Sequence, residues 1–198
     1  MDGNVSGTLD DLLRDIRACT HCEGLPKGPR PVLRGASSAR LCIVGQAPGI
    51  RVHESGIPWN DPSGRRLRQW LDMDEDTFYD ESRIAIAPIG FCYPGTMDNG
   101  GDYPPRRECA PRWHPPLREA FANVELTLLV GSYAQAFYLG KARGKTMTET
   151  VRAWRDYMPA FLPTPHPSWR TTAWQKKNPW FDDELLPELR RRVHELIA

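Results

Sequence analysis

The sequence predicts an α/β protein: a three-layer αβα sandwich with a central four-stranded, mostly parallel sheet. Short apolar segments with the composition of buried strands recur along the chain. Helical patterns separate them, and strands that alternate with helices favour a parallel sheet covered on both faces. The chain has 198 residues, 40% of them hydrophobic, which is enough for one core. We therefore expect a single domain over residues 1–198.

Each element follows from a local pattern. Thr8 followed by Asp11 predicts a capped amphipathic helix that delivers Cys19 at its end. Ser63 is expected to cap a second helix, whose apolar face includes Leu67. We expect strands at residues 40–45, 83–88, 126–131 and 160–163, and further helices at residues 110–121, 133–139, 148–154 and 183–197.

The topology indicates where chemistry should be found. In parallel sheets of this kind, ligands bind beyond the carboxyl ends of the strands. The segments that follow the expected strands are residues 45–61, 90–107, 131–132 and 164–170. A functional site is therefore expected where these segments meet.

Charge and hydropathy exclude some classes of protein. The net charge is only +1, which argues against a coating or histone-like nucleic-acid binder but permits local clusters of arginine. No apolar stretch approaches the length of a membrane span, and the first nine residues lack a basic leader and an apolar core. We expect a cytoplasmic protein, associated with the nucleoid through DNA, and no membrane partner.

Four cysteines indicate a bound metal group. Cys19 and Cys22 form a C-x2-C pair, and Cys92 and Cys109 are separated by sixteen residues in a loop rich in proline and arginine. In a chain whose thiols stay reduced, four such cysteines favour a metal site over disulfides. The uneven spacing favours a [4Fe-4S] cluster and an iron-sulfur cluster loop, with structural zinc as the alternative. Cys42 lies in an apolar run and is expected in the core.

Two strand-end segments carry further candidates. The glycines of residues 45–49 are expected to let backbone amides approach a ligand closely. Trp59 precedes an expected helix start with small residues and arginines, a combination suited to stacking a base and holding a phosphate. His166 lies between two prolines, which favours a fixed imidazole that donates a hydrogen bond to a leaving group. Trp59 alone could equally be a core residue, and a lone histidine is more often structural.

In order along the chain, these blocks resemble the uracil-DNA glycosylase superfamily, and most closely its iron-sulfur family four branch. The resemblance is carried by the four cysteines and their spacing, by residues 45–49, by residues 56–59 with Ser63 and Gly64, and by residues 166–168. It implies base excision repair of DNA: a damaged base is flipped out of the duplex and its N-glycosidic bond is hydrolysed, leaving an abasic site. The implied partner is uracil-containing or abasic DNA, and the chain is expected to act as a monomer.

The resemblance also implies roles for individual residues. His166 would donate to uracil O2 as negative charge builds there, and Trp59 would stack on the flipped base. Gly45, Gln46 and the backbone of Ala47 would line the pocket. The residues implied in contacts with DNA are Ser63, Gly64, Arg65, Arg106, Arg107, Ser168, Trp169 and Arg170, with Trp169 and Arg170 where the family enters the duplex.

The chain departs from the family pattern at three places. Gln46 stands where iron-sulfur relatives carry a glutamate, Val52 and His53 stand where they carry acidic residues, and Pro88 replaces the asparagine that reads uracil. The catalytic candidates are therefore His166, Gln46 and His53, with His53 preferred over Glu54 and Asp61 for activating water. A diverged member that binds damaged or abasic DNA tightly with little turnover remains an alternative, as does a binding module stapled by zinc.

Overall fold

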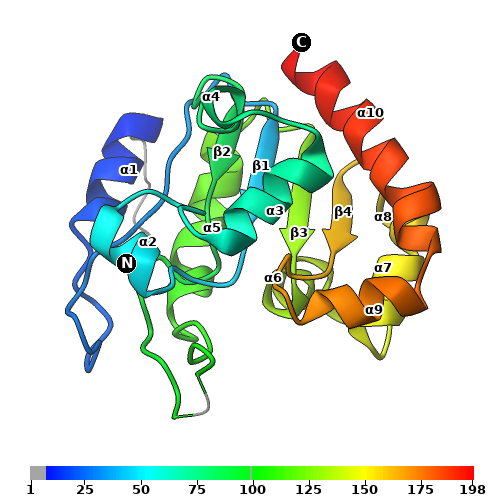
Figure 1. Ribbon diagram of the computed structural model, residues 1–198. Helices are drawn as coiled ribbons and strands as arrows, with labels where there is room; N and C mark the ends of the chain where they lie inside the picture. Colours follow the sequence, from blue (N-terminus) through cyan, green and yellow to red (C-terminus); the bar gives the residue numbers. More distant parts are fainter. Residues whose placement is uncertain (1–7, 99) are drawn as a thin grey trace.

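The computed structural model describes residues 8–98 and 100–198, and its centre is a sheet of four strands (Figure 1). Their order is β2-β1-β3-β4, and all three neighbouring pairs are parallel, which agrees with the predicted sheet. In register, Ile43 of β1 lies opposite Ile86 of β2 and Leu128 of β3. The strands are β1 (Leu41–Val44), β2 (Ile84–Ile86), β3 (Leu126–Val130) and β4 (Phe161–Thr164).

Helices cover both faces of this sheet and complete the predicted three layers. Successive strand side chains point to opposite faces, so Leu41 and Ile43 join one apolar cluster while Cys42 and Val44 join the other. Cys42 is buried, as expected for a core residue. The first cluster contains residues of α3 (Pro62–Leu71), α4 (Glu75–Phe78), α7 (Met147–Arg152), α8 (Trp154–Tyr157) and α10 (Leu186–Ile197). The second contains residues of α1 (Leu9–Arg17), α5 (Cys109–Ala120) and α6 (Ser132–Leu139).

The starts of two helices test the predicted caps. Thr8 and Asp11 form the expected capping box of α1, which ends two residues before Cys19. The prediction that Ser63 caps α3 was wrong: Asp61 is the cap, and its Oδ1 accepts from the backbone N–H of Gly64 at 2.8 Å. Pro62 occupies the first helical position, where its missing N–H costs nothing, so the cap falls on the residue before it.

Other differences from the predicted elements are local. The expected helix over residues 148–154 is two short helices, α7 and α8. A π-helical turn, η2 (Phe181–Leu185), precedes α10 where one continuous helix was predicted. Four short elements were not predicted: α2 (Ile50–Ser55), α4, the 3-10 turn η1 (Gly140–Ala142) and α9 (Thr171–Lys177).

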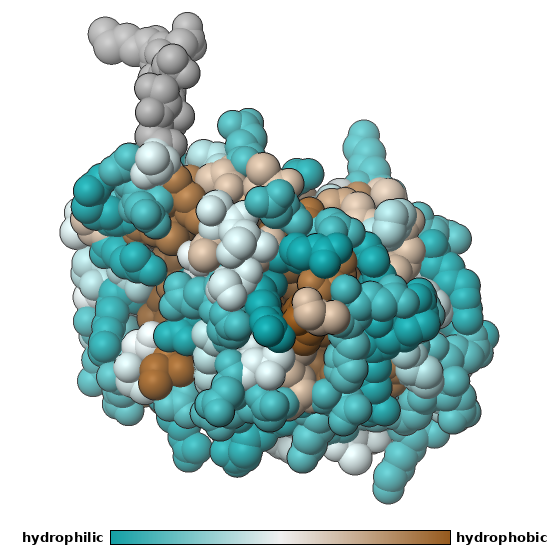
Figure 2. Space-filling model, turned by 90° about the horizontal axis from the view of Figure 1, so that it is seen from above, coloured by the Kyte–Doolittle hydropathy of each residue, from teal (hydrophilic) through white to brown (hydrophobic). Residues whose placement is uncertain are grey.

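The surface at the amino ends of the strands is mostly hydrophilic. Viewed from above, apolar residues show mainly in recesses between polar side chains (Figure 2). Within the described ranges, none of the helices has both the length and the apolar character needed to cross a bilayer. The carboxyl ends of the strands point to the opposite side of the molecule, at the lower edge of the sheet in Figure 1.

Candidate functional site

A pocket lies at the carboxyl ends of the strands, where the topology predicted a ligand site. Its open volume is about 150 Å³. A single water needs only about 10–15 Å³ on this measure, so the pocket has room for a small ring. The lining residues are Val32, Gly45, Gln46, Ala47, Pro48, Gly49, Val52, Pro58, Trp59, Asp61, Ser63, Ile86, Pro88, Asp102 and His166.

Trp59 forms one wall of this pocket in a strained backbone conformation. Its φ is 59°, in the left-handed region that residues other than glycine rarely adopt. Two glycines make room for it. A Cβ on Gly45 would lie 2.8 Å from Cζ2 of the indole, and a Cβ on Gly64 would lie 1.8 Å from the Trp59 carbonyl oxygen. Gly45 and Gly64 are therefore required by the position of the tryptophan, a role that the sequence did not indicate.

His166 forms the wall next to Trp59, in the loop that follows β4. The two rings lie 5.7 Å apart with their planes inclined by 33°. The His166 carbonyl accepts from the backbone N–H of Ser168 at 2.8 Å and from the hydroxyl of Thr171 at 2.5 Å, which fixes the loop. Burial lowers the pKa of His166, while the carboxylate of Asp61 acts in the opposite direction. The imidazole is therefore neutral near pH 7 and has one N–H to donate.

Arg66 fastens the His166 loop to helix α3. Its guanidinium donates to the Ser168 carbonyl and the Thr172 hydroxyl, each at 2.9 Å, and to Oε1 of Gln175 at 2.7 Å. These bonds join the segment that carries Trp59 to the segment that carries His166. The relative position of the two rings is therefore set by the protein itself.

The floor of the pocket is held from below by a buried histidine. His114 is fully buried, and its Nε2 lies 3.0 Å from the carbonyl oxygen of Pro88. A carbonyl can only accept, so Nε2 carries the proton and Nδ1 accepts from the Tyr138 hydroxyl at 2.8 Å. Burial lowers the pKa of His114 to about 4, consistent with this neutral form. The carbonyl of Pro88 is thereby engaged by His114.

Gln46 is the carboxamide that borders the open space. Its Nε2 donates to the Tyr103 carbonyl at 3.3 Å, which holds the side chain against the loop between Cys92 and Cys109. The second amide hydrogen and Oε1 have no hydrogen bond among the described residues. Gly45, Gln46, Ala47, Trp59 and His166, all predicted from the sequence to bind the base, thus line one pocket.

His53, the first choice for activating water, does not line this pocket. The sequence placed it near the base through its position after the first turn, but α2 points Val52 into the pocket and turns His53 away. Its ring lies 5.9 Å from the ring of Tyr93, and burial lowers its pKa, with Arg30 adding to the effect. Two carboxylates do line the pocket: Asp61, named from the sequence, and Asp102, which was not.

The residues predicted to contact DNA are divided by the structure. Ser63 lines the pocket and Gly64 is buried against Trp59. Arg65 and Arg107 are exposed. Trp169 is 78% exposed, and the guanidinium of Arg170 lies over its ring at 5.4 Å. Arg106 is half-buried, and its Nη2 donates to the Gly24 carbonyl at 2.8 Å.

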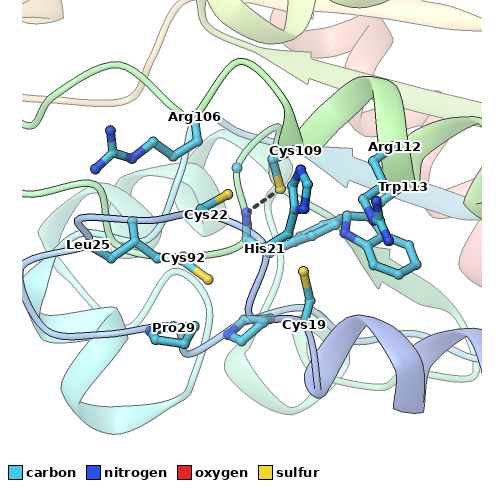
Figure 3. A pocket seen from close by; sticks show the side chains of 13 residues that line it. Cys19, His21, Cys22, Leu25, Pro29, Cys92, Arg106, Cys109, Arg112 and Trp113 are labelled. Atoms are coloured by element: carbon cyan, nitrogen blue, oxygen red, sulfur yellow. Dashed lines mark hydrogen bonds between the residues drawn. The ribbon is translucent and has the colours of Figure 1, made fainter.

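The four cysteines meet at a second pocket, although they come from distant segments. Cys19, Cys22, Cys92 and Cys109 line it together, and Figure 3 shows their sulfur atoms turned toward a common space. The pKa of Cys109 is raised to about 12, chiefly by burial; the other three thiols act in the same direction and the N–H of Phe91 opposes them. The backbone N–H of Phe91 lies 3.5 Å from the Cys109 sulfur and donates to it. In the part of the chain that the structure describes, no three His, Cys, Asp or Glu side chains are grouped as ligands of a single metal ion.

These donors can be tested against the group that the sequence suggested. Four thiols that share one pocket and a backbone N–H directed at one sulfur suit a group held by cysteine thiolates. The donor set therefore suits a group bound through cysteine sulfur.

The fold and the first pocket define an α/β protein with a ligand site at the carboxyl ends of a parallel sheet. The model of the "Uracil DNA glycosylase superfamily" matches residues 33–190. The chain belongs to this superfamily. The matched region begins after Cys19 and Cys22, so it contains only two of the four cysteines.

Among solved structures, the chain is similar to one described as a solution NMR structure of "a putative Uracil DNA glycosylase from Methanosarcina acetivorans". The sequences are 13% identical, and the TM-score is 0.48. The similarity covers 82% of this chain and 98% of the other.

Proposed function

We propose that this protein is a uracil-DNA glycosylase, which flips uracil out of DNA and hydrolyses its N-glycosidic bond. Membership of the superfamily supports this class of reaction. The observation that carries the proposal is the pairing of Trp59 with a neutral His166 on adjacent walls of a pocket sized for a small ring. A flipped base needs an aromatic face to stack on and a donor at the oxygen that becomes anionic.

The residues of the pocket divide the work of bond cleavage. Trp59 stacks on the flipped ring and sets its plane. As the bond between the sugar C1′ and the base N1 breaks, the electron pair passes to the base, and the N–H of His166 donates to O2. A neutral imidazole stabilises this anion without first protonating it. Such a fixed donor is worth roughly a hundredfold to a thousandfold in rate.

Selection of uracil is assigned to Gln46. A carboxamide can accept from the N3–H of uracil through Oε1 and donate to O4 through its free amide hydrogen. Cytosine presents an acceptor at N3 and a donor at C4, so it would leave both atoms of the carboxamide mismatched. The bond to Tyr103 holds Gln46 in one orientation. Gln46 thus takes over the task of the asparagine that Pro88 replaces.

Contacts with DNA are assigned to the exposed residues around the pocket. Arg65, Arg107 and Arg170 carry charges that suit phosphates, and Trp169 is an exposed aromatic that can enter the space left by a flipped base. One chain supplies the pocket and these contacts, so the protein is proposed to act as a monomer on uracil-containing DNA.

The cysteine pocket is proposed to hold a [4Fe-4S] cluster through Cys19, Cys22, Cys92 and Cys109. Four cysteines that line one pocket and come from distant segments support a cluster, because each of its four irons takes one thiolate. When bound, this group would crosslink the segment after α1 to the start of α5 through its bonds to the cysteine sulfurs. Excision of a base transfers no electrons, so no residue of the base pocket depends on redox chemistry there.

The test is a single-turnover assay on oligonucleotides that contain one uracil, with abasic sites cut by alkali. We expect excision from uracil-containing DNA. We expect none from matched DNA with cytosine or thymine at that position. Tight binding of abasic DNA without any cleavage would identify the diverged binding protein instead. If the protein shows no cleavage and no preferential binding, both functions are ruled out.

A further inference from the structure

We propose that Asp102 is the general base that activates water in this excision, an inference that rests on the proposed glycosylase function. Asp102 lies on the long loop between Cys92 and Cys109, which the sequence marked as a strand-end segment without singling out this residue. Three observations support the assignment: the position of Asp102 in the pocket, its hydrogen bonds, and an environment that differs from that of Asp61.

Asp102 faces the base pocket from the side of the cysteine loop. Its side chain lines the same space as Trp59 and His166. A Cβ on Gly49 would lie 3.3 Å from Oδ2 of Asp102, so this oxygen lies directly beside the turn of residues 45–49. A bridge between Thr96 and Asp102 pairs the two limbs of the loop and fixes the backbone of Asp102. The backbone of Asp102 is therefore fixed at the rim of the pocket, and the residue is open to solvent.

A chain of hydroxyl groups orients this carboxylate. The Thr96 hydroxyl donates to Oδ1 of Asp102 at 3.1 Å. Because its proton is used there, Thr96 accepts from the Tyr93 hydroxyl, which lies 2.7 Å away. One carboxylate oxygen is thus occupied by the protein, and Oδ2 has no hydrogen bond among the described residues. A base must keep one such oxygen for water.

The two carboxylates of the pocket have different environments. Oδ1 of Asp61 is committed to the first turn of α3 through the N–H of Gly64. Burial raises the pKa of Asp102, the Asp61 carboxylate raises it further, and the bond from Thr96 opposes both effects. The raised pKa and the uncommitted Oδ2 suit Asp102 to take a proton from water, while the Asp61 carboxylate is engaged with helix α3.

The step balances as a hydrolysis. The C1′–N1 bond breaks and its electron pair leaves on the uracil anion, whose O2 accepts from His166. The water oxygen bonds to C1′ as one of its protons passes to Oδ2 of Asp102. Asp102 then releases this proton to solvent, and the uracil anion takes up a proton from solvent. The products are free uracil and a sugar that carries a hydroxyl at C1′.

The test compares Asp102→Asn with Asp98→Asn under single-turnover conditions across a range of pH. Asp98 is an exposed aspartate on the same loop and does not line the pocket, so its variant controls for the lost charge. Asp102→Asn should slow excision by about a hundredfold or more, the usual contribution of general base catalysis. The wild-type rate should rise with pH through a pKa above the ordinary carboxyl value of 3.8, and this rise should vanish in Asp102→Asn but persist in Asp102→Glu.

The possible outcomes separate the base from the function. Excision by the wild type, with the same rate and pH profile in Asp102→Asn, overturns the role of Asp102 and leaves the glycosylase intact. If Asp102→Asn is slower but its rate still rises with pH as in the wild type, the role as a base is also overturned, because the residue would then act only on structure. No excision of uracil by the wild type overturns the proposed function and the base together. Equal melting temperatures for the two asparagine variants support a comparison of rates free of folding effects.

Discussion

The base pocket and the cysteine pocket are built in different ways. The base pocket is fixed by the protein's own bonds: Asp61 caps α3, Arg66 ties down the His166 loop, and His114 holds the carbonyl of Pro88. Cys22 and Cys92 lie in segments without helix or strand. At this second pocket Arg106 donates to the Gly24 carbonyl and the N–H of Phe91 donates to the Cys109 sulfur. The elements of the base pocket are thus joined by hydrogen bonds, while the segments that carry Cys22 and Cys92 are proposed to be joined by a bound group.

The largest effect should follow removal of one cysteine. Cys92→Ala takes away a thiolate that joins the loop of residues 92–109 to the segment after α1, so the bound group and the order of that loop should both be lost. Structural metals contribute roughly 10 kcal/mol in small domains that depend on them. Iron, acid-labile sulfide and broad visible absorption per chain, measured on anaerobically prepared protein, check this.

Cys42→Ala is the matched control, because Cys42 is buried between β1 and the helices of the second cluster and lies outside the cysteine pocket. It should keep the full iron content of the wild type. Equal loss of iron in both variants would contradict the assignment of ligands. A stoichiometric zinc content in the wild type, with no iron, would show that the pocket holds a different group.

The second effect concerns the base pocket alone. His166→Ala removes the donor to O2 and should slow excision by a hundredfold to a thousandfold. Affinity for uracil-containing DNA should change little, since Trp59 and the exposed arginines remain. The iron content should equal that of the wild type, because His166 does not line the cysteine pocket. Single-turnover rates and binding isotherms measure the two quantities separately, and an unchanged rate would remove His166 from the reaction.

Much of the fold could be predicted because its strands are short apolar runs. Residues 40–45 were predicted and β1 is Leu41–Val44, and the strand predicted at residues 126–131 is β3, Leu126–Val130. Short helices were missed, since α2 and α9 have six and seven residues and show too little periodicity to be read. Asp61 was overlooked as a cap because Ser63, two residues later, also has a side-chain oxygen that can accept from a backbone N–H at a helix start.

The site was predicted less completely, for a geometric reason. Residues directly after a strand, such as Gln46 and His166, are placed by the sheet, so their sequence position predicts their location. His53 lies beyond that range, and the phase of α2 decided which neighbour faces the pocket. Asp102 comes from a long loop rich in glycine and proline, which has no periodicity to place it. The one sequence signal that could have identified Asp102 is its position in a segment that follows a strand, between Cys92 and Cys109.

A third prediction tests how the base pocket is supported. The pKa of His114 is lowered by burial from 6.5 to about 4. Between these two pH values the unfolded chain therefore binds a proton that the folded protein does not bind. The stability contributed by the neutral histidine is fully present above pH 6.5 and is lost as the pH falls toward 4. A shift of this size corresponds to about 3 kcal/mol in the free energy of unfolding. The wild type should lose this stability between the two pH values relative to His114→Gln, as urea unfolding would measure. Parallel profiles would contradict the buried, neutral histidine.

The smallest effect should come from the aromatic wall. Trp59→Ala removes the surface on which the base stacks and keeps the Cβ at this left-handed backbone position. Binding of uracil-containing DNA should weaken by about 1–3 kcal/mol, measured in the His166→Ala background so that turnover does not interfere. Trp169→Ala is the informative partner, because this exposed side chain does not line the pocket. Trp59→Ala should reduce the preference for uracil over matched DNA, while Trp169→Ala should weaken binding to duplexes that contain a flipped or missing base. If both variants lose the same preference, the flipped base does not stack on Trp59, and the base pocket lacks its proposed stacking wall.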